Sequence, residues 1–474
     1  MVTRRRFLGG LGAGVLLAAC GGTPAAPTQA PAATQAPAAS GSSAGAPTQA
    51  AAGAAAQAQS AATKPAAAAQ APASTGPAVE VRVHFRQGDD ATWQDKKFIP
   101  EFNKSQSKYV VKQDTLPPQP EYFPKVAALH ATGTIGDVVW ASDAGFHSLA
   151  FRKIIRAIDD LAKADKYDFS DYLDIGIKDM TWEGKLTGMP WGAHSASPLL
   201  VWNVDAVDKA GVKIPDDIAT YEKLHDAATK LQVVKDGKPD RFGFAPTVGA
   251  AEIFQWMRAF GGSPWDASGK KVTVRSPEAM AGFKEWARYF AEDLSPAPGG
   301  GTNLSQLFAA GKIAMMQTGY SVDFSPGKAI KDFKWDVTLM PKGPTGKLPT
   351  NFTINGITIA TKSKQPEGAW QYLKYLMDPD NQIEIVLSGA GRPAPRKSVL
   401  DNPKLQELKG HRVMVPIFPI SDPWLEPDNF RIEEARTVVD QLSGPIGAKQ
   451  AKVEDKIGDI EKQLQEVLDK PRAE

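Results

Sequence analysis

The sequence predicts an α/β protein built as two lobes, and three observations lead to that prediction. Short apolar runs typical of strands alternate with segments of helical periodicity, which indicates βαβ units and a parallel sheet. The run at 136–140 has valines and a preceding glycine, as a fully buried strand would. The 474 residues exceed what one ordinary hydrophobic core holds, so two lobes are expected.

The first twenty residues are typical of an export address. Arginines at 4–6 precede an apolar segment at 7–19 that is too short to span about 30 Å of hydrocarbon. Residues 3–8 resemble the twin-arginine signal, although the general secretory route stays open. Residues 17–20 resemble the bacterial lipobox, so we expect 1–19 to be a signal peptide and Cys20 to carry lipid. The mature protein would then be exported and anchored to the outer face of the cytoplasmic membrane, extracellular or periplasmic.

Residues 20–78 are predicted to be the lipidated cysteine and a disordered tether. Beyond Cys20 this stretch is almost all Ala, Pro, Gln, Thr, Ser and Gly, with Lys64 as its one charge. It lacks the bulky apolar residues that would offset the entropy of ordering. Such a chain would reach roughly 40–45 Å on average, enough to hold a globular module off a membrane.

From residue 79 onward, strands and helices are expected in alternation. Alternating apolar and charged residues at 79–85 predict the opening strand. The other predicted strands are at 109–111, 136–140, 199–202, 313–316, 335–339 and 354–360, with a hairpin at 182–191 leading into a strand that ends at Pro190-Trp191. One predicted helix begins at 98, and another follows the strand that ends at Trp140 and runs through Leu149 to Ile155. The others cover 122–129, 207–210, 221–231, 253–260, 277–291, 368–377 and the amphipathic tail at 453–468.

Charge and motifs argue against several functional classes. Without the three arginines of residues 1–19, the chain has 52 basic and 53 acidic side chains, which gives no electrostatic case for nucleic acid. No Gly-Lys pair is followed by Ser or Thr, so there is no P-loop. The six histidines lack metal-ligand spacing, and Cys20 is the only cysteine. We therefore expect no metal, no cofactor and no enzymatic activity.

Aromatic residues fall at predicted strand ends or beside glycines. They are Trp140, Trp191, Trp202, Trp256 and Tyr320. Trp140, Asp143 and Phe146 would be displayed where the strand at 136–140 ends, the position at which open α/β sheets collect ligands. Ring faces and a carboxylate suit a polyhydroxylated solute. The alternative interpretation makes Trp140 ordinary core and Asp143 a helix N-cap, and Phe146 is assigned to packing.

Several motifs in order resemble one protein family. They are the run at 136–140 followed by a polar loop, and the segments 182–191, 202–205, 209–212, 308–315, 355–360, 367–373 and 396–398. Together they are similar to the extracellular solute-binding proteins of ABC importers, specifically the carbohydrate type that includes maltose-binding protein. The resemblance implies a type II periplasmic-binding-protein fold of two α/β lobes joined by hinge strands. Lobe one would be 79–190 with 338–388, and lobe two 191–337 with 389–474.

The resemblance also implies a ligand site between the lobes. Its residues would be Trp140, Asp143, Trp191, His194, Trp256, Gly319, Tyr320, Asn355 and Arg392. A sugar or oligosaccharide would be captured there and delivered to the subunits of an ABC permease by hinge closure of a monomeric protein. The chain has Ala144 where some sugar binders carry a basic residue, and Gly319-Tyr320-Ser321 where Gly-Ser-Trp is usual. Both departures bear on which solute is bound.

Three alternatives remain at the level of sequence. A secreted polysaccharide-acting hydrolase or lyase would also use aromatics and carboxylates, but it needs two separated carboxylates for turnover. The same fold could bind a non-sugar solute such as an iron complex, a polyamine or a peptide. The protein could also report its ligand to a membrane receptor without transport.

Overall fold

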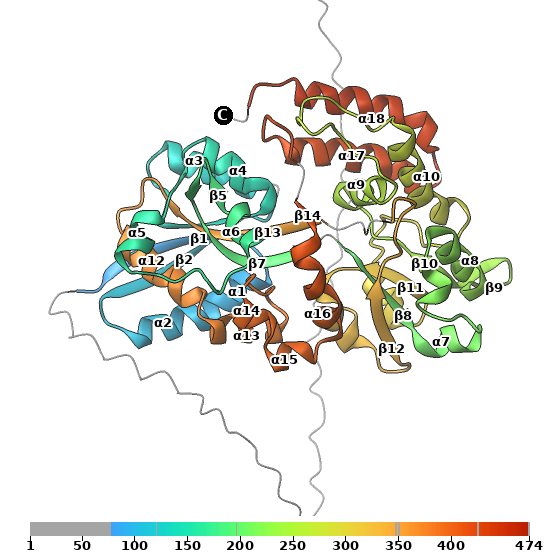
Figure 1. Ribbon diagram of the computed structural model, residues 1–474, viewed down its shortest axis with the longest axis horizontal. Helices are drawn as coiled ribbons and strands as arrows, with labels where there is room; N and C mark the ends of the chain where they lie inside the picture. Colours follow the sequence, from blue (N-terminus) through green and yellow to red (C-terminus); the bar gives the residue numbers. More distant parts are fainter. Residues whose placement is uncertain are drawn as a thin grey trace, which may run out of the picture. The chain divides into compact units, whose positions relative to one another are not determined.

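The computed structural model describes residues 77–119, 121–195, 197–346, 348, 351–423 and 426–472, with the backbone alone at 143, 144, 195, 351 and 423. These residues belong to one compact unit, which spans Gln70–Glu474. The expected signal peptide, Cys20 and the tether up to residue 76 lie outside the described residues. Two large sheets organise the unit, and each is the centre of one lobe (Figure 1).

The first sheet is mixed. Its strands are β1 (Val79–Arg86), β2 (Tyr109–Leu116), β3 (Val138–Ala141), β4 (Ile155–Arg156), β7 (Met189–Ser195), β13 (Asn351–Ala360) and β14 (Asp422–Pro423). β1 pairs in parallel with both β2 and β3, so the carboxyl ends of these strands meet at one edge. β13 runs antiparallel to β3 and to β7. The expected parallel arrangement therefore holds for the first three strands and is broken by β13.

Helices cover this first sheet. They are α1 (Asp89–Trp93), η1 (Gln94–Phe98), α2 (Ile99–Ser105), α3 (Tyr122–Ala131), α4 (Asp143–Phe151), α5 (Asp159–Ala164), α6 (Asp174–Asp179), α12 (Pro366–Leu376) and α13 (Pro379–Ser388), with a small hairpin of β5 (Thr181–Trp182) and β6 (Lys185–Leu186). Val81, Val83 and Phe85 are fully buried in β1, as the predicted alternation requires.

The second sheet has the order β12-β8-β11-β10-β9. These strands are β8 (Leu199–Asn203), β9 (Val233–Lys235), β10 (Lys238–Ala245), β11 (Ile313–Thr318) and β12 (Trp335–Leu339). Around them lie α7 (Val204–Lys209), η2 (Asp216–Ile218), α8 (Tyr221–Leu231), α9 (Ala250–Ala259), α10 (Pro277–Ala291), α11 (Leu304–Ala309), η3 (Tyr320–Asp323), η4 (Gly327–Ala329), α17 (Ile432–Gly447) and α18 (Val453–Leu468). The central strand β11 is buried along its whole length, which explains the apolar run at 313–316 with which it begins.

The chain passes between the two sheets three times. It crosses from β7 to β8, returns from β12 to β13, and leaves again between β14 and α17. The first two passages place β7 and β13, which pair with each other, at the junction of the lobes. This confirms the two-lobed α/β fold with crossing strands.

The segment before the last passage bridges both lobes. It contains α14 (Lys397–Leu400), α15 (Pro403–Gln406), α16 (Lys409–Met414) and η5 (Val415–Ile420). Val399, Leu405 and Phe418 belong to a core cluster that includes the strands of the first sheet, and α16 also packs on β12 and η3. The lobe boundaries expected at 191, 338 and 389 stay a prediction. The segment from α14 to η5 was expected in lobe two, but its contacts extend to both lobes.

Two local expectations were wrong. Pro190 and Trp191 lie inside β7 rather than at the end of a strand, because β7 continues alongside β13 through an irregularity at Asn355 and Gly356. The helix after Trp140 stops at Phe151, and Ile155 already belongs to β4. Among the described residues, the structure contains no helix with the length and apolar character to cross a membrane.

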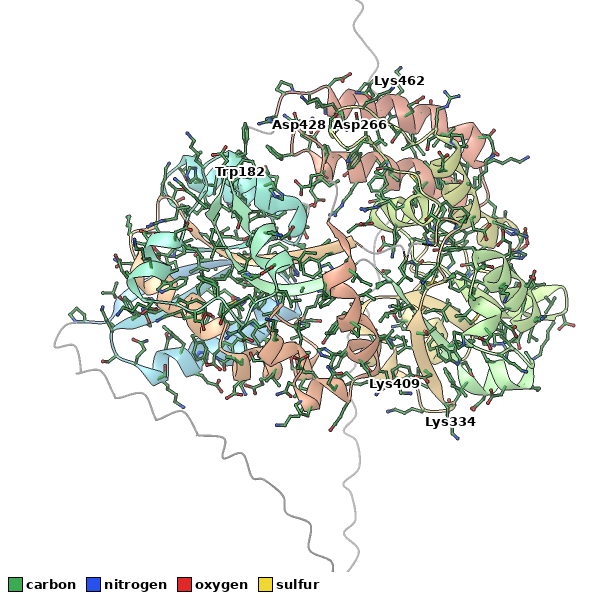
Figure 2. All side chains as sticks on the ribbon, in the orientation of Figure 1. Trp182, Asp266, Lys334, Lys409, Asp428 and Lys462 are labelled. Atoms are coloured by element: carbon green, nitrogen blue, oxygen red, sulfur yellow. The ribbon has the colours of Figure 1, made fainter. Side chains whose placement is uncertain are left out.

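Phe430 joins the last passage to the first lobe. Its ring centroid lies 5.4 Å from that of Trp182 and 5.3 Å from that of Phe151. His147 of α4 stacks nearby, at 6.3 Å and 17°. Figure 2 labels Trp182 on the first lobe and Asp428, two residues before Phe430, beside α17 and α18. Aromatic contacts of this kind stabilise the approach of the two lobes.

Candidate ligand-binding site

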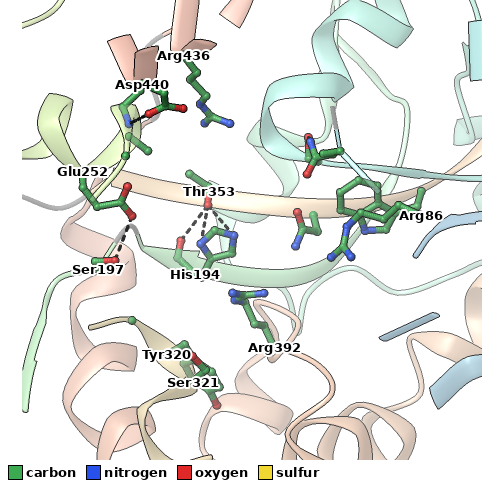
Figure 3. A pocket seen from close by; sticks show the side chains of 18 residues that line it. Arg86, His194, Ser197, Glu252, Tyr320, Ser321, Thr353, Arg392, Arg436 and Asp440 are labelled. Atoms are coloured by element: carbon green, nitrogen blue, oxygen red, sulfur yellow. Dashed lines mark hydrogen bonds between the residues drawn. The ribbon is translucent and has the colours of Figure 1, made fainter. Parts of the chain in front are cut away.

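The larger of two adjoining cavities lies against the paired crossing strands β7 and β13. It has a volume of about 500 Å³ and draws its walls from both lobes and from the crossing strands (Figure 3). Its lining residues are Arg86, Gln119, Trp140, Ser142, His194, Ser197, Gly249, Ala250, Ala251, Glu252, Gly319, Tyr320, Ser321, Thr353, Asn355, Arg392, Arg436 and Asp440. The volume is that of a typical small-molecule site.

Trp140 lies at the carboxyl end of β3 but exposes only 1% of its surface. Phe123 stacks on it at 6.2 Å and 21°, and the guanidinium carbon of Arg86 lies 4.5 Å from the ring centroid. The hydroxyl of Tyr122 donates to the carbonyl of Trp140, which fixes the strand end. Trp140 therefore lines the cavity with its ring largely covered, and the Arg86 guanidinium beside it lines the same cavity.

The turn after β3 begins α4. Ser142 is the N-cap of that helix, and its hydroxyl accepts from the backbone N–H of Gly145 at 3.1 Å. Asp143 is the first helical residue, so the cap falls one residue earlier than the alternative interpretation expected. The side chain of Asp143 lies outside the described part of the structure, and its contact with a ligand stays a prediction.

The crossing strands supply the floor of the cavity. Thr353 of β13 faces His194 of β7, and the Thr353 hydroxyl lies 2.9 Å from Nδ1 of the His194 ring. Asn355 of the same strand is 8% exposed and lines the cavity too. These side chains come from paired strands at the junction, so movement of one lobe against the other would act on them directly.

Two carboxyl groups face the cavity from the second lobe. Glu252 lies in the first turn of α9, and its Oε1 accepts from the hydroxyl of Ser197 at 3.4 Å. Asp440 of α17 accepts from the backbone N–H of Ala250 at 2.6 Å. Burial raises the pKa of both carboxyls, and the nearby cation of Arg436 opposes that shift. They are positioned to accept hydrogen bonds from a solute's hydroxyl groups.

Gly319 and Tyr320 follow β11 directly. The Tyr320 ring is 3% exposed, and its hydroxyl lies 2.6 Å from Nδ1 of His411. Nε2 of His411 lies 2.7 Å from the carbonyl of Leu400, which can only accept, so Nε2 carries the proton and Nδ1 accepts from Tyr320. Burial raises the pKa of the Tyr320 hydroxyl. Tyr320 is thus a fixed, neutral wall of the site.

A second cavity of about 270 Å³ adjoins the first. Trp191, Gly192, Asp89, Asp90, Phe324 and residues 389–391 line it, together with five residues that also line the first cavity: Arg86, Tyr320, Ser321, Asn355 and Arg392. Trp191 is 4% exposed and packs edge-on against Phe85 with ring centroids 5.3 Å apart. Asp90 accepts from Arg86 at 3.2 Å, and burial raises the pKa of its carboxyl.

Most of the predicted site residues with described side chains meet at these cavities. Trp140, His194, Gly319, Tyr320, Asn355 and Arg392 line the first, and Trp191 lines the second. Trp256 lines neither: it is 1% exposed in the middle of α9, and its Nε1 donates to Oε1 of Gln317 at 3.0 Å. That placement indicates packing in the second core. The ligand-binding roles themselves stay predictions.

Apart from Arg392, sequence reasoning missed the charged residues of the first cavity. They are Arg86, Glu252, Arg436 and Asp440. Arg86 is the last residue of β1. In open α/β sheets ligands collect at the carboxyl ends of strands, and this rule, which indicated Trp140, applies equally to Arg86. Glu252 follows Gly249, whose φ of 131° marks a special backbone turn before α9. Arg436 and Asp440 are four residues apart on one helix and carry no local signal, because only the packing of α17 brings them to the cavity.

The side chains that line the first cavity are mainly hydrogen-bonding groups. Among the residues that the structure describes, no group of three or more His, Cys, Asp or Glu side chains could hold a metal ion. The lining instead combines guanidinium donors, carboxylate acceptors and largely covered rings, which can hydrogen-bond a polar solute and exclude water around it.

Comparisons with known proteins place the chain in a family. The profile of the bacterial extracellular solute-binding proteins matches residues 97–412, about two thirds of the chain. A binding protein of Brucella abortus (strain 2308) is 24% identical over 215 residues, 44% of this chain and 51% of that protein. The chain thus spans about half the length of the curated relatives it matches.

Solved structures agree on the fold. An ABC substrate-binding protein from Listeria monocytogenes in complex with cycloalternan has a TM-score of 0.69 and 19% identity, covering 82% of this chain and 99% of that one. UgpB from Mycobacterium tuberculosis in complex with glycerophosphocholine also has a TM-score of 0.69, with 20% identity, 84% of this chain and 99% of that one. At such identities the likeness concerns the fold. The profile match over most of the globular region decides the family: this chain belongs to the bacterial extracellular solute-binding proteins.

Proposed function

We propose that this protein is the substrate-binding lipoprotein of an ABC uptake system and captures a sugar or oligosaccharide between its lobes. The observation that carries the proposal is the cavity of about 500 Å³ at the crossing strands, which both lobes line with hydrogen-bonding groups. A solute held there contacts Asn355 and His194 from the strands and Glu252 from the second lobe. Closure around the solute would produce the form that a permease recognises.

Several similar structures support a polyhydroxylated ligand. The Listeria protein is described with cycloalternan, and a T. maritima protein is described with maltose. The lining of this chain suits such solutes, since Glu252 and Asp440 accept from hydroxyl groups while Arg86 and Arg392 donate to ring and hydroxyl oxygens. The protein would bind as a monomer and perform no covalent chemistry.

A second candidate is a solute that also carries a phosphate or carboxylate. Arg86, Arg392 and Arg436 all line the cavity, and guanidinium groups match anionic oxygens in geometry. The glycerophosphocholine complex of the Mycobacterium protein is consistent with such a ligand in this fold. Counter-charges from Asp90 and Glu433 lie beside two of these arginines, so the neutral saccharide remains the first candidate.

A thermal-shift screen tests both candidates. Neutral mono- and oligosaccharides, uronates, sugar phosphates, glycerophosphodiesters, polyamines and metal salts would be added to the purified protein. A ligand at 100 times its Kd should add about 2.7 kcal/mol of stability. Stabilisation by neutral saccharides supports the proposal, and stabilisation by the anionic solutes alone supports the second candidate. A response confined to amines or metals would contradict both.

A further inference from the structure

A histidine of the first lobe lies against a glutamate on the second, outside both cavities. Nδ1 of His147 on α4 is 3.1 Å from Oε2 of Glu426, and both of these atoms are buried. Neither residue lines a cavity described above. We infer that this inter-lobe pair takes up a proton as the lobes close, so that solute binding strengthens as the pH falls. The inference rests on the proposed function and adds its regulation by pH.

Hydrogen bonds attach the chain around Glu426 to the second lobe. The backbone N–H of Asp428 donates to the carbonyl of Gly269 at 3.1 Å. The side-chain amide of Asn429, which is 5% exposed, donates to the carbonyl of Val467 in α18 at 2.6 Å. Separation of the lobes would therefore carry the glutamate away from the histidine of α4, and the inter-lobe pair exists only while the lobes are together.

Aromatic rings enclose the inter-lobe pair. The ring of His147 stacks on Phe430 at 6.3 Å and 17°, and its centroid lies 5.8 Å from that of Trp182. The side chain of Glu426 is only 11% exposed. Surroundings of this kind deprive a carboxylate of hydration, so a neutral imidazole leaves its charge poorly compensated, whereas an imidazolium compensates it. Closure of the lobes therefore favours the protonated form of the histidine.

The direction of the pH dependence follows from these charges. A histidine in water titrates near about pH 6.5, so at lower pH the ring is protonated whether the lobes are open or closed. The closed form holds this proton more tightly, because the carboxylate of Glu426 lies beside the ring. Solute affinity should therefore be highest below about pH 6.5, and it should fall as the pH rises until the ring is neutral in both forms.

Other charged side chains on the surrounding elements leave this direction unchanged. Among the described residues they are Arg152 and Lys153 after α4, Glu183 and Lys185 in the β5–β6 hairpin, and Lys270, Asp428, Arg431 and Arg472 in the second lobe. Carboxylates, lysines and arginines ordinarily keep their charge between about pH 6 and about pH 8. Asp428 and Arg472 also pair with each other at 3.0 Å. The histidine is thus the group whose charge changes in this range.

The test compares the wild type, His147→Gln, Glu426→Gln and a matched control, His225→Gln. His225 also lies beside a glutamate, with Nε2 2.7 Å from Oε2 of Glu292, but both residues belong to the second lobe. Isothermal titration with maltose, or with the saccharide that stabilises the protein most in the thermal-shift screen, would give Kd at about pH 6 and about pH 8. From the lower to the higher pH, Kd should rise roughly fivefold more in the wild type and the control than in either variant of the inter-lobe pair.

Proton uptake is a second readout of the same titration. Repeating it near pH 7 in buffers of different ionisation enthalpy counts the protons taken up on binding. The wild type and His225→Gln should take up a larger fraction of a proton than His147→Gln. The carboxyls of Glu252 and Asp440 in the cavity are common to all four proteins, so the comparison isolates the inter-lobe pair.

The outcomes separate this inference from the proposed function. An equal pH dependence of Kd in the wild type and His147→Gln overturns the inference, and so does loss of that dependence in the control. Thermal melts report folding, and if His147→Gln does not fold, Glu426→Gln carries the same comparison.

Failure of every saccharide to bind contradicts the proposed function instead, and the inter-lobe pair is then tested without solute. Small-angle X-ray scattering of the ligand-free wild type should give a smaller radius of gyration at about pH 6 than at about pH 8, whereas His147→Gln should show no such difference. Equal radii at both pH values in the wild type would overturn the inference.

Discussion

The charged residues of the cavity, rather than its rings, are expected to dominate affinity. Trp140, Trp191 and Tyr320 are at most 4% exposed, so their faces are largely covered. Arg392 lines both cavities and can reach a solute in either. Ligand binding by this protein should therefore depend more on hydrogen-bond geometry than on stacking area.

Replacing Arg392 by glutamine should weaken saccharide binding roughly 10- to 100-fold, because a hydrogen bond from a charged donor contributes about 1.5–3 kcal/mol. Arg392→Lys should recover only part of the loss, since lysine keeps the charge but not the planar fork. Isothermal titration measures both. Arg275→Gln is the control: its side chain is 60% exposed and pairs with Glu461 on the surface. An Arg392→Gln protein within twofold of the wild type would exclude Arg392 as a ligand contact.

Glu252 should make the ligand-free protein less stable as pH rises. Burial raises the pKa of this carboxyl in the folded state from its ordinary value of 4.5. The folded state therefore holds the proton more tightly than the unfolded chain, and the free energy of unfolding falls as pH climbs above 4.5 towards the raised pKa. Glu252→Gln removes this contribution.

Urea unfolding at several pH values would measure the effect. The wild type should lose stability relative to Glu252→Gln as the pH passes from about 4.5 upwards, and the difference should level off above the folded-state pKa. Asp440, whose pKa is also raised by burial, is present in both proteins, and its charge adds to the rise in the pKa of Glu252. Parallel stability curves would show that Glu252 ionises in the folded protein as freely as in the unfolded chain.

At the scale of elements, the passage between β14 and α17 holds the lobes together through Phe430. Its ring meets Trp182 and Phe151 of the first lobe at 5.4 and 5.3 Å, and the guanidinium of Arg472 lies 5.3 Å from it. Such ring pairs contribute about 0.5–1.5 kcal/mol each beyond their burial. Separation of the lobes would break these contacts.

Replacing Phe430 by alanine should speed release of a bound solute about 5- to 30-fold, the effect of removing 1–2 kcal/mol from the closed form. Stopped-flow dissociation measures this directly. Phe333→Ala serves as a control, because its ring pairs with Phe308 at 5.7 Å beside β11, within the second lobe. An unchanged dissociation rate in Phe430→Ala would mean that the passage between β14 and α17 moves together with the first lobe. Its contacts would then not stabilise the closed form.

Local periodicity predicted individual elements well. The helices at 221–231, 277–291 and 453–468 and the strand at 335–339 have the expected bounds. Trp191 was misplaced because the irregularity that carries β7 past it depends on β13, more than 150 residues later in the chain. Trp256 lines neither cavity for a related reason: Gly261 and Gly262 follow its helix, but the face it occupies is set by packing against Tyr221.

At the scale of the whole molecule, the order of motifs predicted more than any single motif. It indicated the family and the two-lobed fold, both of which are confirmed. The two carboxyl groups of the site were still hidden, because Glu252 and Asp440 are brought together by α9 and α17, which are far apart in the sequence. Contacts of that kind arise only once the second lobe has folded.

The amino end gives a prediction about location. If Cys20 carries lipid, Cys20→Ser should move the protein from the membrane fraction to the soluble exported fraction while its affinity for solute stays the same. Cell fractionation followed by titration of the released protein measures both properties. Equal membrane association of the wild type and the variant would contradict lipid anchoring at this residue.

The positions of the tryptophans should make the intrinsic fluorescence of the protein sensitive to solute binding. Trp140 and Trp191 line the two cavities, whereas Trp265 and Trp286 are sealed in the second core. A solute that enters should therefore shift the fluorescence emission of Trp140 and Trp191, while the emission of Trp265 and Trp286 stays constant. Removing one cavity tryptophan at a time, as Trp140→Phe or Trp191→Phe, would reveal which cavity fills first. The kinetics of solute binding could then be followed without attaching any dye.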